Sequence, residues 1–273
     1  VQKLFRQPNN PLSIIINEEN KGYINIEDGF SSMYTIEVCD YLDNKILITI
    51  PIEGMHAEIT PARVPGPGLE LARAGQGTKI EKGKFEIYIP PGALYEDAHL
   101  AIRARGDTLH FHKDEIPIHK NITLKIDAAN YKRADLEKLY IGRLNYKGLP
   151  YYTPTTRNGS VLTARTRSFG SYTVVADTAP PKIRPLNFTS GKWISKNKTL
   201  KIKIEDAHSG ISSYRATLNG QYILTEYDYK RNTLTYYFED AVSTQTENNL
   251  KVIVTDNVGN SATYGASFFR KQP

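Results

Sequence analysis

Close to its C-terminus the chain reads Val254-Thr255-Asp256-Asn257-Val258-Gly259-Asn260, and a related stretch near the N-terminus reads Val38-Cys39-Asp40-Tyr41-Leu42-Asp43-Asn44. In both copies an alternating apolar run leads into an Asp, an Asn closes a short turn, and a second extended run follows. Alternation with a period of two predicts half-buried strands, and Asp and Asn are typical turn residues. Each copy therefore predicts the last hairpin of a small β-sandwich.

The Asp and Asn side chains of these two stretches have a structural interpretation. Asp40 and Asp256 open their turns at a position where a carboxylate oxygen can accept a backbone N–H two residues further on. Asn44 and Asn260 close the turns. We interpret all four residues as structural parts of the turns.

An alternative for the second copy is a calcium site. Asp206 and Asp256, with Glu205 nearby, could approach one another at the rim of the last module and bind calcium through oxygen ligands. The calcium-loop consensus of alternating acidic residues and Gly is missing, so the interpretation as turn caps is preferred.

Length and composition agree with a chain of β-modules. The 273 residues are enough for two or three domains, and 18 Tyr against 2 Met, with 19 Gly and 15 Pro, suit strands joined by tight turns. We expect an all-β fold of tandem immunoglobulin-like or fibronectin-like β-sandwich modules. Their expected bounds are 1–60 for the C-terminal half of an incomplete sandwich, 61–178 for a central sandwich, and 179–273 for a C-terminal immunoglobulin-like sandwich.

The expected strands follow from apolar alternation between turn residues. In the first module they are Ser13–Asn17, Tyr23–Glu27, Met33–Asp40 and Lys45–Glu53. In the central module they include a strand ending at Pro90-Pro91-Gly92, then Leu100–Arg103, Ile122–Ile126, Lys138–Gly142 and Ser171–Val175, with one helical turn over Ala134–Lys138. In the last module they are Thr199–Glu205, Ile211–Leu218, Gln221–Tyr229, Thr233–Glu239, Asn249–Asp256 and Ser261–Phe269.

Two connections carry specific signals. Asn219-Gly220 predicts a two-residue hairpin turn of the primed type. Asp177-Thr178-Ala179-Pro180-Pro181 predicts a stiff hinge between the second and third modules.

Charge is unevenly distributed along the chain. Residues 1–60 hold 4 basic and 9 acidic side chains (−5), residues 61–178 hold 18 and 12 (+6), and residues 179–273 hold 13 and 8 (+5). The excess positive charge of residues 61–273 would favour association with an anionic polymer such as a cell-wall component. There is no nucleic-acid-binding signature and no stretch of roughly 20 apolar residues that could span a membrane. The chain begins at Val1 without a signal-like segment, so we expect it to be a piece of a longer protein.

Cys39 is the only cysteine, so no intramolecular disulfide can form. We expect a lone cysteine beside a turn Asp to behave as a small buried hydrophobic side chain.

Several stretches together resemble a known family. They are Ile89–Asp97, Pro181–Asn187, Trp193–Ser195, Asp206–Ile211 and Thr255–Asn260, in this order. The chain resembles the C-terminal part of the lysostaphin/LytM-like murein zinc metallopeptidases of Bacteroidetes, which carry β-sandwich modules after the catalytic domain. The resemblance implies a secreted parent protein that cleaves peptidoglycan cross-bridges in the cell envelope, in the periplasm or at the cell surface. It also implies that zinc is held in an upstream catalytic domain.

The active site of that family needs an H-x-x-x-D motif and a separate H-x-H motif to hold zinc with an open position. Here both patterns are superimposed in His110-Phe111-His112-Lys113-Asp114, and one short strand cannot supply two motifs. We interpret His110 and His112 as a solvent-facing pair on an edge strand. We therefore expect no catalytic residue, cofactor or metal site in this chain.

Two functions from different classes remain open. The first is a non-catalytic accessory region that acts either as a spacer or as an intramolecular inhibitor of the catalytic domain. Its expected partners are its own upstream catalytic domain and peptidoglycan or another anionic envelope polymer. The alternative is a glycan-binding or adhesion module. In that case exposed aromatic side chains could stack on sugar rings, and the candidates are Trp193, Tyr222, Tyr227 and Tyr229.

Overall fold

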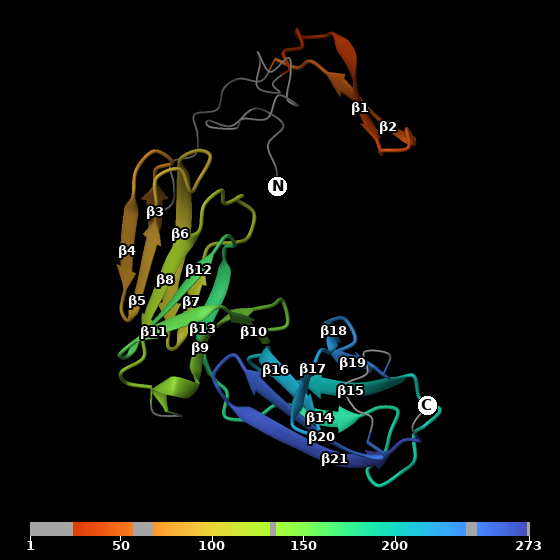
Figure 1. The fold of residues 1–273 in the computed structure, drawn as a ribbon. Coiled ribbons are helices and arrows are strands. Elements are labelled where there is room, and N and C mark those ends of the chain that lie inside the picture. Colours follow the sequence, from red (N-terminus) through yellow and green to blue (C-terminus); the bar gives the residue numbers. More distant parts are fainter. Residues whose placement is uncertain (1–23, 57–67, 132–134, 239–244, 272–273) are drawn as a thin grey trace. The chain divides into compact units, whose positions relative to one another are not determined.

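A computed structural model describes residues 24–56, 68–131, 135–238 and 245–271. The chain divides into two compact units, residues 1–67 and residues 68–273 (Figure 1). The described residues are all-β apart from one short 3-10 helix, with tandem β-sandwich modules in the second unit and a two-stranded sheet in the first. Within the described part of the chain there is no helix long and apolar enough to cross a bilayer.

The first unit contains a hairpin of β1 (Ser31–Cys39) and β2 (Lys45–Glu53), paired antiparallel with Val38 opposite Ile46. One face carries a row of apolar side chains that remain accessible, Val38 at 51% and Ile46 at 60%. Residues 24–27 form no strand, so the prediction of a strand at Tyr23–Glu27 was wrong there. The predicted strand Ser13–Asn17 lies outside the described residues.

Cys39 is exposed, so the expectation of a buried cysteine was wrong. Successive side chains of a strand point to opposite faces. Cys39 therefore shares its face with Glu37 and not with the apolar Val38. Its Sγ lies 3.4 Å from Glu37 Oε1, and Glu37 also pairs with Lys45 at 2.8 Å. The hydrogen bond to Glu37 raises the pKa of the Cys39 thiol, with smaller contributions from desolvation and from the charge of Glu37.

The second unit begins with a sandwich of two antiparallel sheets. One has the order β10-β9-β13-β7-β6-β3 and the other β11-β12-β8-β5-β4. The elements are β3 (Leu69–Ala72), β4 (Thr78–Lys82), β5 (Phe85–Ile89), β6 (Ala98–Arg105), β7 (Thr108–Phe111), β8 (Ile122–Asp127), the 3-10 helix (Leu136–Lys138), β9 (Leu139–Leu144), β10 (Pro150–Thr153), β11 (Thr155–Asn158), β12 (Val161–Thr166) and β13 (Gly170–Ala176). 

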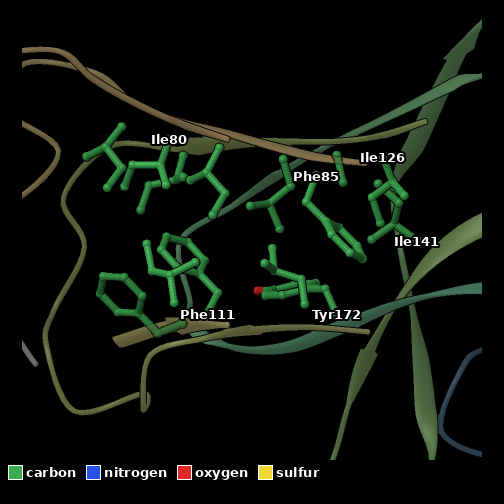
Figure 2. Close-up of a cluster of buried hydrophobic side chains, with 14 of the residues drawn as sticks. Ile80, Phe85, Phe111, Ile126, Ile141 and Tyr172 are labelled. Atoms are coloured by element: carbon green, nitrogen blue, oxygen red, sulfur yellow. The ribbon is translucent and has the colours of Figure 1, made fainter. Parts of the chain in front are cut away.

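Alternate side chains of both sheets fill the core of this sandwich. On β5, Phe85, Ile87 and Ile89 are at most 2% exposed, and they pack with residues of the facing sheet such as Phe111 and Tyr172 (Figure 2). Burial of such side chains is the main stabilising contribution to the fold.

The last sandwich has two four-stranded sheets, of order β14-β15-β19-β18 and β17-β16-β20-β21. Its strands are β14 (Lys182–Pro185), β15 (Thr199–Glu205), β16 (Ile211–Leu218), β17 (Gln221–Ile223), β18 (Glu226–Asp228), β19 (Thr233–Tyr237), β20 (Glu247–Asp256) and β21 (Ser261–Phe269). It has a core of its own, built from inward-facing residues such as Ile202, Val252 and Phe268.

The turn at Asn219-Gly220 is of the predicted primed type, because both residues have positive φ, 52° and 79°. The prediction of one strand over Gln221–Tyr229 was wrong. The segment divides into β17, which pairs with β16, and β18, which pairs with β19 in the other sheet.

Candidate functional site

His110, His112 and Asp114 do not form a common site. β7 lies between β13 and β6, so the expectation of an edge strand was wrong. His110 Nδ1 lies 2.9 Å from Ser171 Oγ, while His112 Nδ1 accepts the backbone N–H of Ala101 at 3.1 Å. Burial lowers the pKa of His112, which favours its neutral form.

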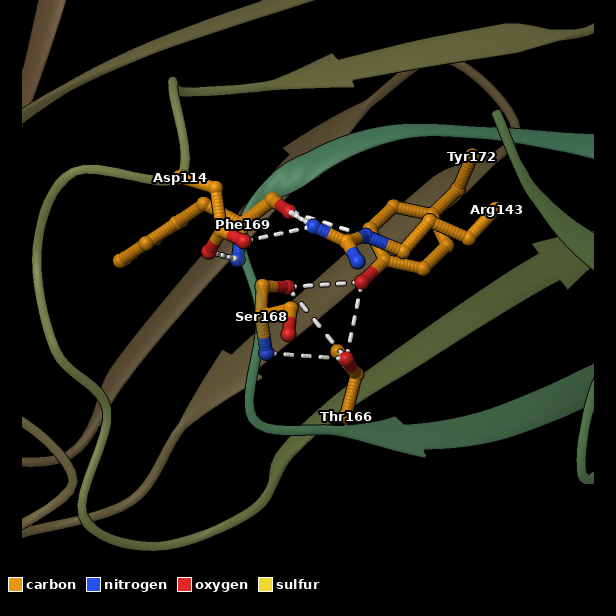
Figure 3. Close-up of polar contacts among 6 residues, drawn as sticks. All are labelled: Asp114, Arg143, Thr166, Ser168, Phe169 and Tyr172. Atoms are coloured by element: carbon orange, nitrogen blue, oxygen red, sulfur yellow. Dashed lines mark hydrogen bonds and ion pairs between the residues drawn. The ribbon is translucent and has the colours of Figure 1, made fainter. Parts of the chain in front are cut away.

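Asp114 is occupied by a structural network (Figure 3). Its Oδ2 lies 2.7 Å from Arg143 Nη2, and its Oδ1 accepts the backbone N–H of Phe169 at 3.0 Å. Arg143 Nη2 also donates to the carbonyl of Phe169 at 3.0 Å. These bonds fix the segment that leads into β13, so the carboxylate that completes the H-x-x-x-D pattern stabilises the fold at this point.

Tyr172 closes the same segment from inside the core (Figure 3). Its hydroxyl donates to the carbonyl of Ser168 at 2.7 Å and lies 2.8 Å from Thr166 Oγ1. A buried tyrosine that bonds back to the main chain a few residues upstream is the tyrosine-corner arrangement of many β-sandwiches.

The four aromatic residues considered for glycan stacking do not share one surface. Trp193 is 59% exposed and packs on Phe269 of edge strand β21, with ring centroids 5.5 Å apart. Tyr222 lies on β17, at the opposite edge of the same sheet. Tyr227 belongs to β18 in the other sheet, and Tyr229 follows β18 with 71% exposure.

Three carboxylates converge where the two sandwiches of the second unit meet. Asp177 follows β13 of the first sandwich, Asp206 follows β15 of the second, and Asp256 is the last residue of β20. One ligand oxygen from each lies within 4.8 Å of the others. In the described ranges this is the one group of three or more His, Cys, Asp or Glu side chains that converges in this way. We refer to these residues as the carboxylate cluster.

Each carboxylate of the cluster is held by N–H donors. Asp256 Oδ1 accepts the backbone N–H of Val258 (2.9 Å) and Asn260 (2.8 Å), and its Oδ2 accepts the side-chain amide of Asn260 at 2.7 Å. Asp206 Oδ1 accepts two further N–H groups, from His208 (3.0 Å) and Gly210 (2.7 Å). 

Asp177 connects the two sandwiches. Its Oδ1 accepts the N–H of Ala179 at 3.1 Å and its Oδ2 that of Ser209 at 3.0 Å. None of the ion pairs between described residues involves the cluster. Glu205, which the sequence placed near the cluster, instead pairs with Lys203 at 2.7 Å.

Two buried hydroxyl groups at this joint, Ser209 Oγ and Tyr140 OH, have no hydrogen-bond partner among the described residues. Ser209 is 1% exposed and Tyr140 is fully buried, although Tyr140 belongs to neither hydrophobic core. Burial, together with the charges of Asp177 and Asp206, raises the pKa of Tyr140 to about 12. The Tyr140 hydroxyl therefore stays protonated.

Further bonds join the two sandwiches around the cluster. The side-chain amide of Asn260 donates to the carbonyl of Asp177 at 3.0 Å, and Lys138 Nζ donates to the carbonyl of Val258 at 3.2 Å. The sequence analysis considered that Asp206 and Asp256 could lie close together, but it did not identify Asp177 or Tyr140 as neighbours of this site. The available signal was an Asp two residues before Ala179, a spacing that suits an Asx turn.

Comparisons with known proteins address the fold. Residues 70–177 match a family model described as a Zu5-like domain, a range that spans the first sandwich of the second unit and ends at Asp177. Among solved structures, the chain is similar to the fibronectin(III)-like modules of Clostridium thermocellum CbhA. The identity is 11%, the match covers 56% of this chain and 85% of that chain, and the TM-score is 0.27. No curated protein matches the chain.

Proposed function

We propose that this chain is a non-catalytic accessory region that positions or regulates a secreted, peptidoglycan-cleaving zinc metalloendopeptidase at the cell envelope. β-Sandwich modules of this kind typically bind, space or anchor. The observation that carries the proposal is the joint between the two sandwiches, where polar contacts of Asn260 and Lys138 reinforce a connection containing Pro180 and Pro181. A stiff pair of modules is suited to hold an attached domain at a set distance from a polymer.

Charge supports contact with an anionic polymer. Residues 61–273 carry a net excess of 11 positive charges, from +6 and +5 in the two modules. On β6, Arg103 and Arg105 are exposed, and Arg103 is directly opposite exposed His110 on β7. Exposed charges of this kind give weak attraction that salt screens.

The test is a pull-down of the purified chain on isolated wall sacculi at about 20 mM and about 500 mM NaCl, because the Debye length falls several-fold over this range. We expect weak binding that is lost at high salt. A charge-reversed Arg103→Glu/Arg105→Glu variant should bind less at low salt, and Lys45→Glu, in the acidic first segment, is the matched control. Binding that is independent of salt and competed by free glycan would favour the glycan-binding alternative.

The accessory role also predicts the behaviour of the isolated chain. It should not hydrolyse peptidoglycan peptides, and it should hold no stoichiometric zinc, because His110, His112 and Asp114 have separate structural partners. One tightly bound zinc per chain that is lost in His110→Ala would contradict the proposal. For the parent protein, H-x-x-x-D followed by H-x-H in the upstream coding sequence is the expected finding.

A further inference from the structure

We propose that Asp177, Asp206 and Asp256 bind one calcium ion at the joint between the two sandwiches. This inference goes beyond the accessory role and does not depend on it. The starting point is the convergence of three carboxylates without any ion pair to a described Lys or Arg. Like charges at this distance repel one another, and little solvent screens them because Asp177 and Asp256 are 1% and 2% exposed.

The hydrogen bonds of the turns leave acceptor capacity for an ion. A carboxylate has about four lone-pair positions, so three carboxylates have about twelve. Seven N–H bonds use seven of these. In particular, Asp206 Oδ2 accepts no hydrogen bond from a described residue, since both N–H donors of that side chain bond to Oδ1. Turn capping therefore accounts for the position of each Asp but not for the free acceptor capacity of the cluster, above all that of Asp206 Oδ2.

The two unpartnered hydroxyls provide an independent observation. A buried hydroxyl without a partner is unfavourable and is rare in folded proteins. Here Ser209 Oγ and Tyr140 OH are both buried. Ser209 donates its backbone N–H to Asp177. Tyr140 lines a pocket at the joint together with Asn257 and Val258 of the turn that Asp256 opens. A cation held by the carboxylates would give Ser209 Oγ a partner as a neutral oxygen ligand, and a water on the ion would give one to Tyr140.

The chemistry of the donors selects calcium. All of the candidate ligands are oxygens, which excludes the softer metals that prefer Cys and His. The ligand atoms of the cluster all lie within 4.8 Å of one another, a spread that the coordination sphere of calcium accommodates. Calcium takes roughly six to eight oxygen ligands in flexible geometry, whereas magnesium demands near-ideal octahedral geometry and usually keeps several waters, so three protein carboxylates favour calcium.

Bound calcium would connect the end of β13 to the ends of β15 and β20. The ion would thereby tie the first sandwich to the second through ligands from both, and it would stabilise the folded joint in proportion to its occupancy.

The experiment uses the full chain, stripped with EDTA and titrated with CaCl2 by calorimetry and by thermal melts. We expect one ion per chain with a dissociation constant of roughly 10⁻⁵–10⁻³ M. At about 5 mM calcium the melting temperature should rise by roughly 5 °C, with a smaller rise in magnesium. Asp206→Asn should abolish the rise but keep the melting temperature in EDTA, since its amide oxygen can still accept the two N–H groups.

Asp40→Asn is the matched control, because Asp40, like Asp206, accepts the N–H groups two and four residues further on but lies outside the cluster. It should leave the calcium response intact. If Asp206→Asn fails to fold, Ser209→Ala decides, since it removes only an unpartnered hydroxyl and should weaken calcium binding about fivefold. The proposal is overturned if the parent chain binds no calcium in calorimetry and its melting temperature does not rise at about 5 mM calcium, a concentration above the expected dissociation constant. It is equally overturned by an undiminished response in Asp206→Asn, by unchanged affinity in Ser209→Ala, or by an equal response to magnesium.

Discussion

The turns that open at Asp40 and at Asp256 are the same local structure in different surroundings. In both, the carboxylate Oδ1 accepts the N–H groups two and four residues on, at 2.8 and 2.9 Å in the first turn and 2.9 and 2.8 Å in the second. In both, the Asn side chain donates to Oδ2 at 2.7 Å. Asp40 is exposed, whereas Asp256 is 2% exposed and lies among two further carboxylates.

This comparison separates what the local sequence does from what the fold adds. The Asp-x-x-x-Asn pattern is sufficient to close the turn, since it does so in both places. Whether the remaining oxygens face water or other carboxylates depends on chain segments that are distant in sequence. The difference between the two turns therefore lies in Asp177 and Asp206, which converge with Asp256.

The largest expected difference is between the two Asp→Ala variants. Asp256→Ala leaves three N–H bonds of a buried turn without their acceptor, which should lower the free energy of unfolding by about 2–3 kcal/mol after some relief of repulsion within the cluster. In Asp40→Ala water can replace the carboxylate, so global unfolding should be nearly unchanged. Denaturant unfolding of the full chain in EDTA is followed by far-UV circular dichroism for all modules and by the fluorescence of Trp193 for the last sandwich.

Equal effects of the two substitutions would break the comparison, because they would mean that burial adds nothing to the turn. Asp256→Asn serves as the control for charge. It keeps an acceptor oxygen at the same position and should be much milder than Asp256→Ala in EDTA.

The next comparison is between two buried tyrosines, Tyr172 and Tyr140, whose hydroxyl groups differ in their hydrogen bonds. Tyr172→Phe removes a hydroxyl that bonds to the Ser168 carbonyl and to Thr166, and it should lower the free energy of unfolding by about 1–2 kcal/mol. Tyr140→Phe removes a hydroxyl without a partner, so in EDTA it should be neutral or slightly stabilising. Thermal melts of both variants without metal test this. A clear loss in Tyr140→Phe would show that its hydroxyl already has a partner at the joint.

Much of the fold could be predicted from the sequence, and particular elements show why. β15, β16 and β21 were predicted residue by residue, because apolar alternation ends at clear turn residues such as Asn219-Gly220. The division of Gln221–Tyr229 was not predictable in the same way. Burial alternates without interruption from Ile223 through Leu224 to Thr225, so the pattern carries no sign that the chain changes sheets there.

The site was predictable only in part. Asp256 and Asp40 could be interpreted as turn residues because their bonds are local. Asp177 could not be assigned to the cluster, since its position beside Asp206 depends on how the first sandwich meets the second. The neighbouring Pro180 and Pro181 indicated a hinge, so this segment was interpreted as a connection between modules and not as part of a metal site. Long-range convergence of this kind follows from tertiary structure, which periodicity and turn signals do not encode.

A smaller difference is expected between the two closing asparagines. Asn260 donates to Asp256 Oδ2 and also to the Asp177 carbonyl across the joint, whereas the Asn44 amide donates only to Asp40 among the bonds of the described residues. Asn260→Ala should therefore lower the free energy of unfolding by about 1 kcal/mol. Asn44→Ala should leave global unfolding unchanged in the same denaturant series. An Asn260→Ala chain that is as stable as the parent would show that the bond to Asp177 contributes nothing to the joint.

The smallest effect concerns pH at the exposed turn. The side-chain bond from Asn44, then its backbone N–H, lowers the pKa of Asp40 from its ordinary value of 3.8. A carboxyl group whose pKa is lower in the folded state stabilises that state above its unfolded pKa, and this contribution is lost as pH falls through the folded pKa. Amide exchange of Leu42 and Asn44 should therefore be protected above pH 3.8 and should lose this protection as pH falls below it, relative to intrinsic exchange. In Asn44→Ala the carbon-13 titration of the Asp40 carboxyl should move back up toward 3.8, and an unchanged titration would mean that the Asn44 side chain does not hold this turn.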